Sequence, residues 1–324
     1  MPIIHRLSEL AWPSQESSSP ATSWTDTGSR IAAILALGVW VGAGIWYSDA
    51  GVPDNTESAR QQSASQATKS SAPTAEYMIA AYSGVPYNYD SSVTLKKNGT
   101  HDFTVEPVEW RSEPFIDPIY YGIRVVRWFG EGRTGTMLDF THSKAIAELK
   151  NDGHFKGIVD GAQAPETAKL GDVFKRLEFS HGHNMLTLNG LLRLADLHPR
   201  LSPYIGLGAG VNLPHTEIQL QSDPSRTYEY QMTGPALQGL VGLEFRLPRM
   251  SYFIEYKFTF ASYDAPLTGL DGTKIGLFAD LYRQAARWFS GEAASQGNLT
   301  TQLNSHQVVG GLGVRFAPRT AASP

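Results

Sequence analysis

The residues best suited to chemistry are histidines, two of which lie one residue apart in the stretch Phe179-Ser-His-Gly-His-Asn184. After these histidines the chain continues as an alternating strand, with leucines at every second position and polar residues between them. Because side chains repeat with period two along a strand, we expect His181 and His183 to lie on the same polar face. Neutral imidazole is the commonest protein ligand for metal ions, so this pair predicts two ligands aimed the same way.

Other ligand-type residues lie at the ends of neighbouring predicted strands, and His215 and Glu217 have the same spacing as the first pair. Two or three histidines with one carboxylate suit iron, manganese, copper or zinc. The alternative is that each histidine makes separate hydrogen bonds at a polar rim. The candidate metal ligands are His181, His183, His215 and His306, and the candidate catalytic residues are His142, His183 and Glu217.

The elements that must position these residues are strands, because alternating segments recur between residues 76 and 317. Short and long connections between these segments alternate strictly, so every long connection falls at one end of an up-and-down barrel. Transmembrane barrels of outer membranes have this asymmetry. The predicted fold is therefore all-β, an eight-stranded antiparallel transmembrane barrel. Its eight segments are Glu76–Ser83, Pro118–Phe129, Thr134–Ser143, His181–Leu194, Ser202–Leu213, Thr227–Leu247, Ser251–Ser262 and His306–Phe316.

One face of each segment is apolar and the other carries charged residues, among them Arg124, Asp139, Glu255 and Lys257. An apolar outside and a polar inside is the lipid-embedded pattern, and the inward charges either pair with one another or form a proton or substrate path. Period two alone does not say which face is inside. A soluble lipocalin-like barrel on a membrane anchor has the same alternation with the apolar face inward.

The N-terminal quarter of the chain differs from the barrel. Residues 1–30 are polar and unpatterned, residues 31–47 are an apolar run without a charge, and residues 48–75 are rich in Ser, Ala, Gln and Thr. We interpret these parts as a disordered extension, a hydrophobic signal or anchor segment, and a disordered linker. A signal peptidase would find small residues at Ser48-Asp-Ala50; without cleavage the segment would be an inner-membrane anchor.

Composition excludes several classes of protein. The chain has no cysteine, which rules out disulfides, thiolate metal sites and a cysteine nucleophile. A net charge of -4 without basic clusters argues against nucleic-acid binding. No P-loop, nucleophile elbow or dinucleotide fingerprint occurs in a fitting context.

Several stretches resemble the bacterial lipid A oxidase family, whose members are eight-stranded outer-membrane barrels. The most specific are Phe179–Asn184 and Leu138–Lys144; the others are Glu76–Gly84, Pro118–Arg124 and Ser202–Gly210 with Pro214-His215. The resemblance covers about residues 76–316. It implies oxidation of the proximal glucosamine of lipid A to 2-aminogluconate, with molecular oxygen as co-substrate and release of hydrogen peroxide.

Oxygen reacts slowly with closed-shell organic molecules, so an oxidase needs a metal or an organic redox cofactor. Since no flavin motif is present, a divalent metal ion at the rim histidines is the expected cofactor, with Glu217 or a histidine as the base. We expect a monomer in the outer membrane that contacts lipid A or lipopolysaccharide. The alternative functions are a non-enzymatic structural or adhesive outer-membrane barrel and the lipocalin-like binder.

Overall fold

The computed structural model describes residues 75–130, 132–272, 276–292 and 295–316. The interpretations of residues 1–30, 31–47 and 48–74 as extension, hydrophobic segment and linker fall outside these ranges. Within the described residues, no helix combines the length and the apolar composition needed to cross a membrane.

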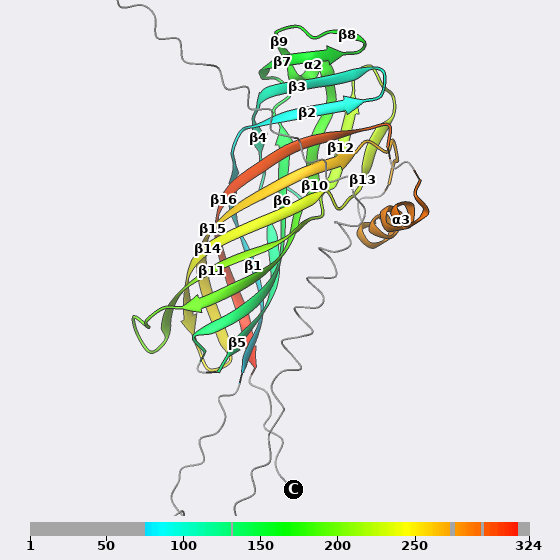
Figure 1. Cartoon of the computed structure of the whole chain (residues 1–324). Helices are drawn as coiled ribbons and strands as arrows, with labels where there is room; N and C mark the ends of the chain where they lie inside the picture. Colours follow the sequence, from blue (N-terminus) through cyan, green and yellow to red (C-terminus); the bar gives the residue numbers. More distant parts are fainter. Residues whose placement is uncertain (1–74, 131, 273–275, 293–294, 317–324) are drawn as a thin grey trace, which may run out of the picture. The chain divides into compact units, whose positions relative to one another are not determined.

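Eight antiparallel strands close into a barrel, because β1 pairs with β5 on one side and with β16 on the other (Figure 1). The order around the barrel is β1-β5-β6-β10-β11-β14-β15-β16. Seven of the eight predicted strands each correspond to one barrel strand, several of them longer than expected. The sixth prediction, a single strand over Thr227–Leu247, is wrong, because this segment divides into β13 (Arg226–Tyr230), which lies outside the barrel, and the barrel strand β14. The bounds of the eight barrel strands are β1 Glu76–Asn88, β5 Tyr121–Phe129, β6 Thr134–Ala147, β10 Phe174–Arg193, β11 Leu201–Asn212, β14 Gly234–Arg246, β15 Met250–Pro266 and β16 Gly297–Phe316.

The outer surface of the barrel is apolar, as the alternation predicts for a lipid-facing wall. Leu207 is 75% exposed, and Val241 and Leu312 are each 50% exposed. Inward positions on β5 and β6 hold Arg124 and Asp139, which are fully buried. A soluble lipocalin-like barrel would have the reverse arrangement, so that alternative is wrong. Closed antiparallel barrels with an apolar outside and a polar inside are those of outer membranes.

Charged residues inside the barrel are paired. Arg124 donates from its two terminal nitrogens to Glu255 at 2.6 and 2.9 Å, and its Nε lies 3.3 Å from Asp139 Oδ1. Lys257 Nζ donates to Asp139 Oδ2 at 2.9 Å and to the Tyr82 hydroxyl at 2.8 Å. Two cations therefore face two carboxylates. Of the two interpretations of the inward charges, mutual pairing is the one that describes these four residues.

The long connections were expected to be loops, and this expectation is wrong for most of their length. They fold into further strands that continue the sheet beyond the barrel, because β10 and β16 run past their neighbours and offer free edges to β12 and β2. We call these elements the outer extension (Figure 1). They are β2 Ser91–Lys97, β3 His101–Val108, β4 Trp110–Arg111, β7 Asp152–Val159, β8 Ala162–Gln163, β9 Thr167–Lys169, α2 Leu170–Val173, β12 His215–Leu220 and β13 Arg226–Tyr230.

The polarity of the wall reverses between the barrel and the outer extension. In the extension, the inward residues are apolar, for example Val93, Phe103 and Phe174, which form one core. Outward residues such as Lys96 and Lys156 are exposed to water. Since an apolar interior with a polar exterior is the pattern of a water-soluble sheet, the reversal marks the outer boundary of the membrane.

One helix, α3 (Leu277–Ser290), lies outside the wall beside β13 (Figure 1). Its Asp280 Oδ2 accepts a hydrogen bond from the Tyr230 backbone at 2.9 Å. Its Gln284 side chain bonds both backbone groups of Met232, at 2.8 and 3.1 Å. The helix is therefore attached to the protein through polar residues.

The lipid-facing wall gives a first testable prediction. Leu207→Arg or Val241→Arg should destabilise the assembled barrel by about 2–4 kcal/mol, because each places a charge on the lipid face near the bilayer midplane. Unfolding by urea in phospholipid vesicles measures this cost. Ser92→Arg, on the exposed side of the outer extension, is the matched control and should change little. Equal stability of all three variants would contradict the lipid-facing assignment.

Candidate metal centre

A bulge in β10 determines where its two histidines point. Between Phe179 and His183 the strand has extra residues relative to β6. Gly182, within this bulge, has a backbone φ of +148°, which residues with a side chain rarely adopt. A Cβ at Gly182 would lie 2.3 Å from the Asn184 side chain, so glycine is required here. The regular alternation therefore does not continue from His183 back to His181.

As a result the two imidazoles do not share a face. His183 is fully buried, with its Nδ1 against the Tyr263 hydroxyl on the core side. His181 instead contacts Glu217 on β12. The side chain of Glu217 lies on the opposite face of β12 from Ile218, which belongs to the core of the extension. The expectation that the H-x-H pair aims two ligands the same way is wrong because of the bulge.

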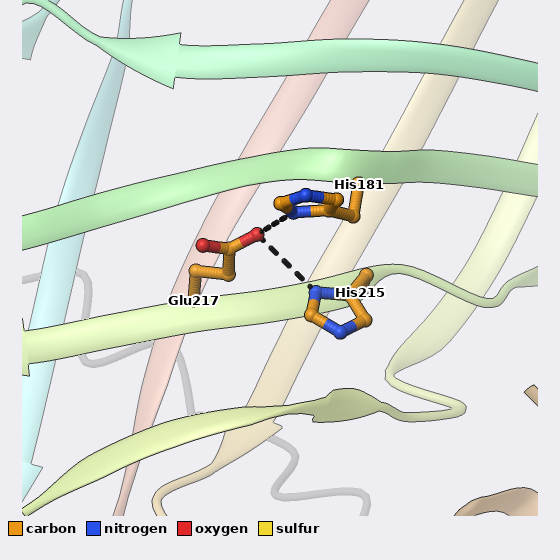
Figure 2. A group of neighbouring side chains, drawn as sticks. All are labelled: His181, His215 and Glu217. Atoms are coloured by element: carbon orange, nitrogen blue, oxygen red, sulfur yellow. Dashed lines mark hydrogen bonds and ion pairs between the residues drawn. The ribbon is translucent and has the colours of Figure 1, made fainter. Parts of the chain in front are cut away.

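His181, His215 and Glu217 form a compact group, the His–His–Glu cluster (Figure 2). One ligand atom from each residue lies within 4.8 Å of the others. His215 Nδ1 is 3.3 Å from Glu217 Oε1, an ion-pair distance without hydrogen-bond alignment. Ser180 Oγ donates to the same carboxylate oxygen at 2.9 Å. His215 and Glu217 are fully buried, and the His181 side chain is 21% exposed.

Several polar atoms of the cluster have no hydrogen-bond partner within the described residues. They are both ring nitrogens of His215 and Oε2 of Glu217. A buried polar atom without a partner costs about 1–3 kcal/mol, so native proteins rarely leave three of them together. A cation bound between the two rings and the carboxylate would satisfy atoms on both residues. The donor set therefore fits a divalent metal ion.

Aromatic rings enclose the cluster on the β13 side. Tyr228 and Tyr230 contact the His215 ring edge to face, with centroids 4.5 and 4.7 Å away. Tyr228 also contacts His181 at 5.8 Å. Packing of this kind fixes the orientation of the imidazoles, which a metal site requires of its surroundings.

The carboxyl group of Glu217 is ionised. Burial alone would raise its pKa, but the contacts from His215, His181 and Ser180 outweigh burial and lower the pKa to about 2. Glu178, its cross-strand neighbour on β10, has the opposite shift: burial and the negative charge of Glu217 raise its pKa. Arg176 lies 2.6 Å from Glu178 and 3.7 Å from Glu217, so one cation faces both carboxylates.

These shifts predict a pH dependence in the absence of metal. The lowered pKa of Glu217 stabilises the folded chain above the ordinary glutamate range, and this contribution is lost as pH falls through about 2. In the Glu217→Gln variant, the free energy of unfolding should no longer show this decrease as the pH is lowered. Glu178→Gln should act in the opposite direction, since a raised pKa destabilises the ionised form. If the free energy of unfolding depended on pH in the same way in both variants below the ordinary glutamate range, the assigned pKa shifts would be contradicted.

The remaining predicted site residues lie outside the cluster. His142 Nδ1 is 2.7 Å from Asn184 Oδ1, and its ring stacks on Tyr121. His306 lies on the outer face of β16 among Tyr87, Tyr89 and Tyr256. The structure therefore brings together His181, His215 and Glu217 of the predicted set, and it does not bring His142, His183 or His306 to them.

Sequence reasoning did not single out Ser180, Glu178, Arg176, Tyr228 or Tyr230. The first three lie within five positions before His181, so their closeness to His181 could have been predicted from this one strand. The two tyrosines have no such signal. They reach His215 because β13 pairs with β12 in a hairpin, whereas both tyrosines were expected in the barrel strand Thr227–Leu247.

Comparisons with known proteins return only distant likenesses. No protein-family model matches the chain, and no curated protein matches it. Among solved structures, Neisserial surface protein A (NspA) is 9% identical, with 74% of this chain and 97% of that one covered and a TM-score of 0.32. Ail, the attachment invasion locus protein of Yersinia pestis, crystallised with the heparin analogue sucrose octasulfate, is 11% identical, with coverage of 75% and 99% and a TM-score of 0.29.

The translocator domain of the autotransporter NalP from Neisseria meningitidis is 10% identical, with coverage of 91% and 100% and a TM-score of 0.19. At these values none of the three likenesses supports an argument about this chain. The fold itself defines the class of protein: an eight-stranded outer-membrane β-barrel with a folded outer extension. The site adds a candidate metal centre on the outward side of that extension.

Proposed function

We propose that this chain is an outer-membrane oxidoreductase that binds a divalent metal ion at the His–His–Glu cluster and uses molecular oxygen. The observation that carries the proposal is the donor set itself. Two imidazoles and one carboxylate converge, and three of their buried polar atoms have no hydrogen-bond partner within the described residues. This combination, with positions left open for other ligands, is typical of non-haem iron(II) enzymes that use oxygen.

The proposed substrate is the proximal glucosamine of lipid A, oxidised to 2-aminogluconate. Two facts support it: the resemblance of Phe179–Asn184 and Leu138–Lys144 to lipid A oxidases, and the position of the cluster. The cluster lies on the outward side of β12, just beyond the lipid-facing wall. A sugar in the headgroup layer of the outer leaflet would be at this level.

The reaction balances with oxygen as the only oxidant. The C1 hydroxyl of the reducing-end sugar loses its proton, and the C1–H bond gives up its electron pair. Oxygen accepts two electrons and two protons and becomes hydrogen peroxide. The sugar becomes a lactone, which takes up water and opens to the carboxylic acid. A metal ion bound at this site would supply the capacity to transfer electrons to oxygen, which protein side chains lack.

The chain's own residues divide into ligands and a base. Glu217 is a weak base because its pKa is about 2, so we assign it as a ligand with His181 and His215. Glu178 is the better candidate base, since its pKa is raised and it lies directly across from Glu217. Arg176 donates a hydrogen bond to the Glu178 carboxylate, and its positive charge partly compensates the negative charge of that group.

Mass spectrometry of lipid A tests the proposal. Lipid A from cells that express the chain should gain the mass of about one oxygen atom on its proximal sugar, and cells without it should not. Glu178→Gln should lower this conversion while leaving the metal content unchanged. Unmodified lipid A in expressing cells, with the metal-loaded barrel present in the outer membrane, would refute the substrate.

A second candidate function is a non-enzymatic structural or adhesive outer-membrane barrel. The observation that favours it is the outer extension, a folded sheet with its own core and a polar outer surface, which suits contact with other molecules. In that case the His–His–Glu cluster would serve only stability. Cells that express the His215→Ala variant would then bind surfaces as well as wild-type cells do, and lipid A would be unchanged in both.

A further inference from the structure

Helix α3 carries an exposed row of aromatic residues. Phe278 is 86% exposed, and Tyr282 and Phe289 are each 76% exposed. With Ala286 between the last two, these residues follow the spacing that places side chains on one face of a helix. We call Phe278, Tyr282, Ala286 and Phe289 the aromatic stripe.

The opposite face of α3 is polar, although it is the face that contacts the protein. Asp280 and Gln284 are buried, and three hydrogen bonds join them to Tyr230 at the end of β13 and to Met232, two residues further on. Arg287 adds an ion pair, with its Nη2 3.7 Å from Glu229 Oε1. A helix on a water-soluble protein buries its apolar face and exposes its polar one. In α3 the arrangement is reversed.

The reversal has a physical explanation in the position of the helix. Gln284 is bonded to Met232, and the lipid-facing row of β14 begins three residues later with Pro235 and continues with Leu237, which is 52% exposed. At about 3.3 Å per residue along a strand, Met232 is only about 10 Å from the first lipid-facing position. Helix α3 therefore lies beside β13, near the outer end of the lipid-facing wall (Figure 1). Its aromatic stripe is on the side of the helix opposite the polar residues that attach it.

We propose that α3 is an interfacial helix whose aromatic stripe inserts into the outer leaflet of the membrane, at the boundary between headgroups and acyl chains. Helices that lie in this plane carry aromatic residues on the lipid side and cationic residues near the headgroups. Arg283, which is half exposed, is suitably placed for the second role. This inference rests on the barrel surface and not on the proposed enzymatic activity.

The chain has no cysteine, so single cysteines can carry a fluorescent probe without background. We would label Ala286→Cys on the aromatic stripe, Leu207→Cys on the lipid-facing wall and Lys156→Cys on the outer extension with an environment-sensitive dye. The full chain would be reconstituted in phosphatidylcholine–phosphatidylglycerol vesicles whose acyl chains are brominated near the headgroup. Bromine quenches only probes that contact the acyl region.

The Ala286 probe should be blue-shifted and should lose at least half as much intensity as the Leu207 probe, whereas the Lys156 probe should be unaffected. Quenching of the Ala286 probe no greater than that of Lys156 would overturn the proposal. Shielding of the Ala286 probe that disappears when the protein is diluted in lipid would mean that a second copy covers the stripe, and would overturn it equally. Normal heat-resistant migration in gels would verify that each labelled barrel is folded.

Discussion

Replacing His181 and His215 together by alanine should abolish both metal binding and lipid A oxidation while leaving the barrel assembled. The two substitutions remove both nitrogen ligands of the His–His–Glu cluster and leave one carboxylate. Loss of a residue that only orients a ligand lowers metal affinity 10–100-fold, so loss of two ligands should lower it by more than about 100-fold. Elemental analysis of the purified barrel gives the metal content, and mass spectrometry of lipid A gives the activity.

Three further variants make the test specific. His306→Ala and His183→Phe alter histidines that the structure does not bring to the cluster, and both should keep the metal. His198→Ala, in the short connection at the other end of the barrel, should keep both metal and activity. Should His306→Ala lose the metal while the double variant retains it, the site would be elsewhere on the rim.

The barrel could be predicted from the sequence because its signal repeats along every strand. Period two separates Val241 and Leu312 from Asp139 and Lys257, and the asymmetry of the connections indicates that the apolar face is the outer one. The structure agrees at these four positions. The same periodicity also predicts the position of His306, although the candidate site was not chosen accordingly. His306 has the parity of Val308, so it had to lie on the outer face, away from the other histidines.

The cluster could be predicted only in part, because its geometry depends on a departure from regularity. His181 and His183 have the same parity, yet the bulge at Gly182 sends them to different partners. A positive backbone φ in a glycine is not visible in the alternation of neighbouring residues. His215 and Glu217 were recognised from their spacing, but the strand that carries them, β12, was expected to be a loop.

The strands of the outer extension were missed for a different reason. Val93 with Leu95 and Phe103 with Val105 alternate as clearly as the barrel strands do, and all four residues are buried. Residues 84–117 were interpreted only as one of the long external connections typical of outer-membrane barrels, so this alternation was not used. Length was a usable signal, since loops longer than about 12–15 residues without secondary structure are uncommon.

The second large effect is expected inside the barrel, where Lys257 and Asp139 are buried together. Asp139→Ala removes the carboxylate that accepts from Lys257 Nζ at 2.9 Å and leaves the cation between Tyr82 and Thr141. Removing one partner of a buried ion pair costs about 3–5 kcal/mol, because the remaining charge is no longer compensated. Urea unfolding in vesicles, followed by tryptophan fluorescence, should show a loss of that size.

The double variant Asp139→Leu with Lys257→Met distinguishes a lost ion pair from lost packing. It removes both charges and fills their space, while Arg124 keeps its two bonds to Glu255. Replacing a buried pair by apolar residues of similar volume is often neutral, so the double variant should recover most of the stability that Asp139→Ala loses. If Asp139→Ala costs less than about 1 kcal/mol, the pair behaves like a solvated surface pair and water must reach it. If the double variant is as unstable as the single one, packing around these residues, and not their charge, stabilises this part of the barrel.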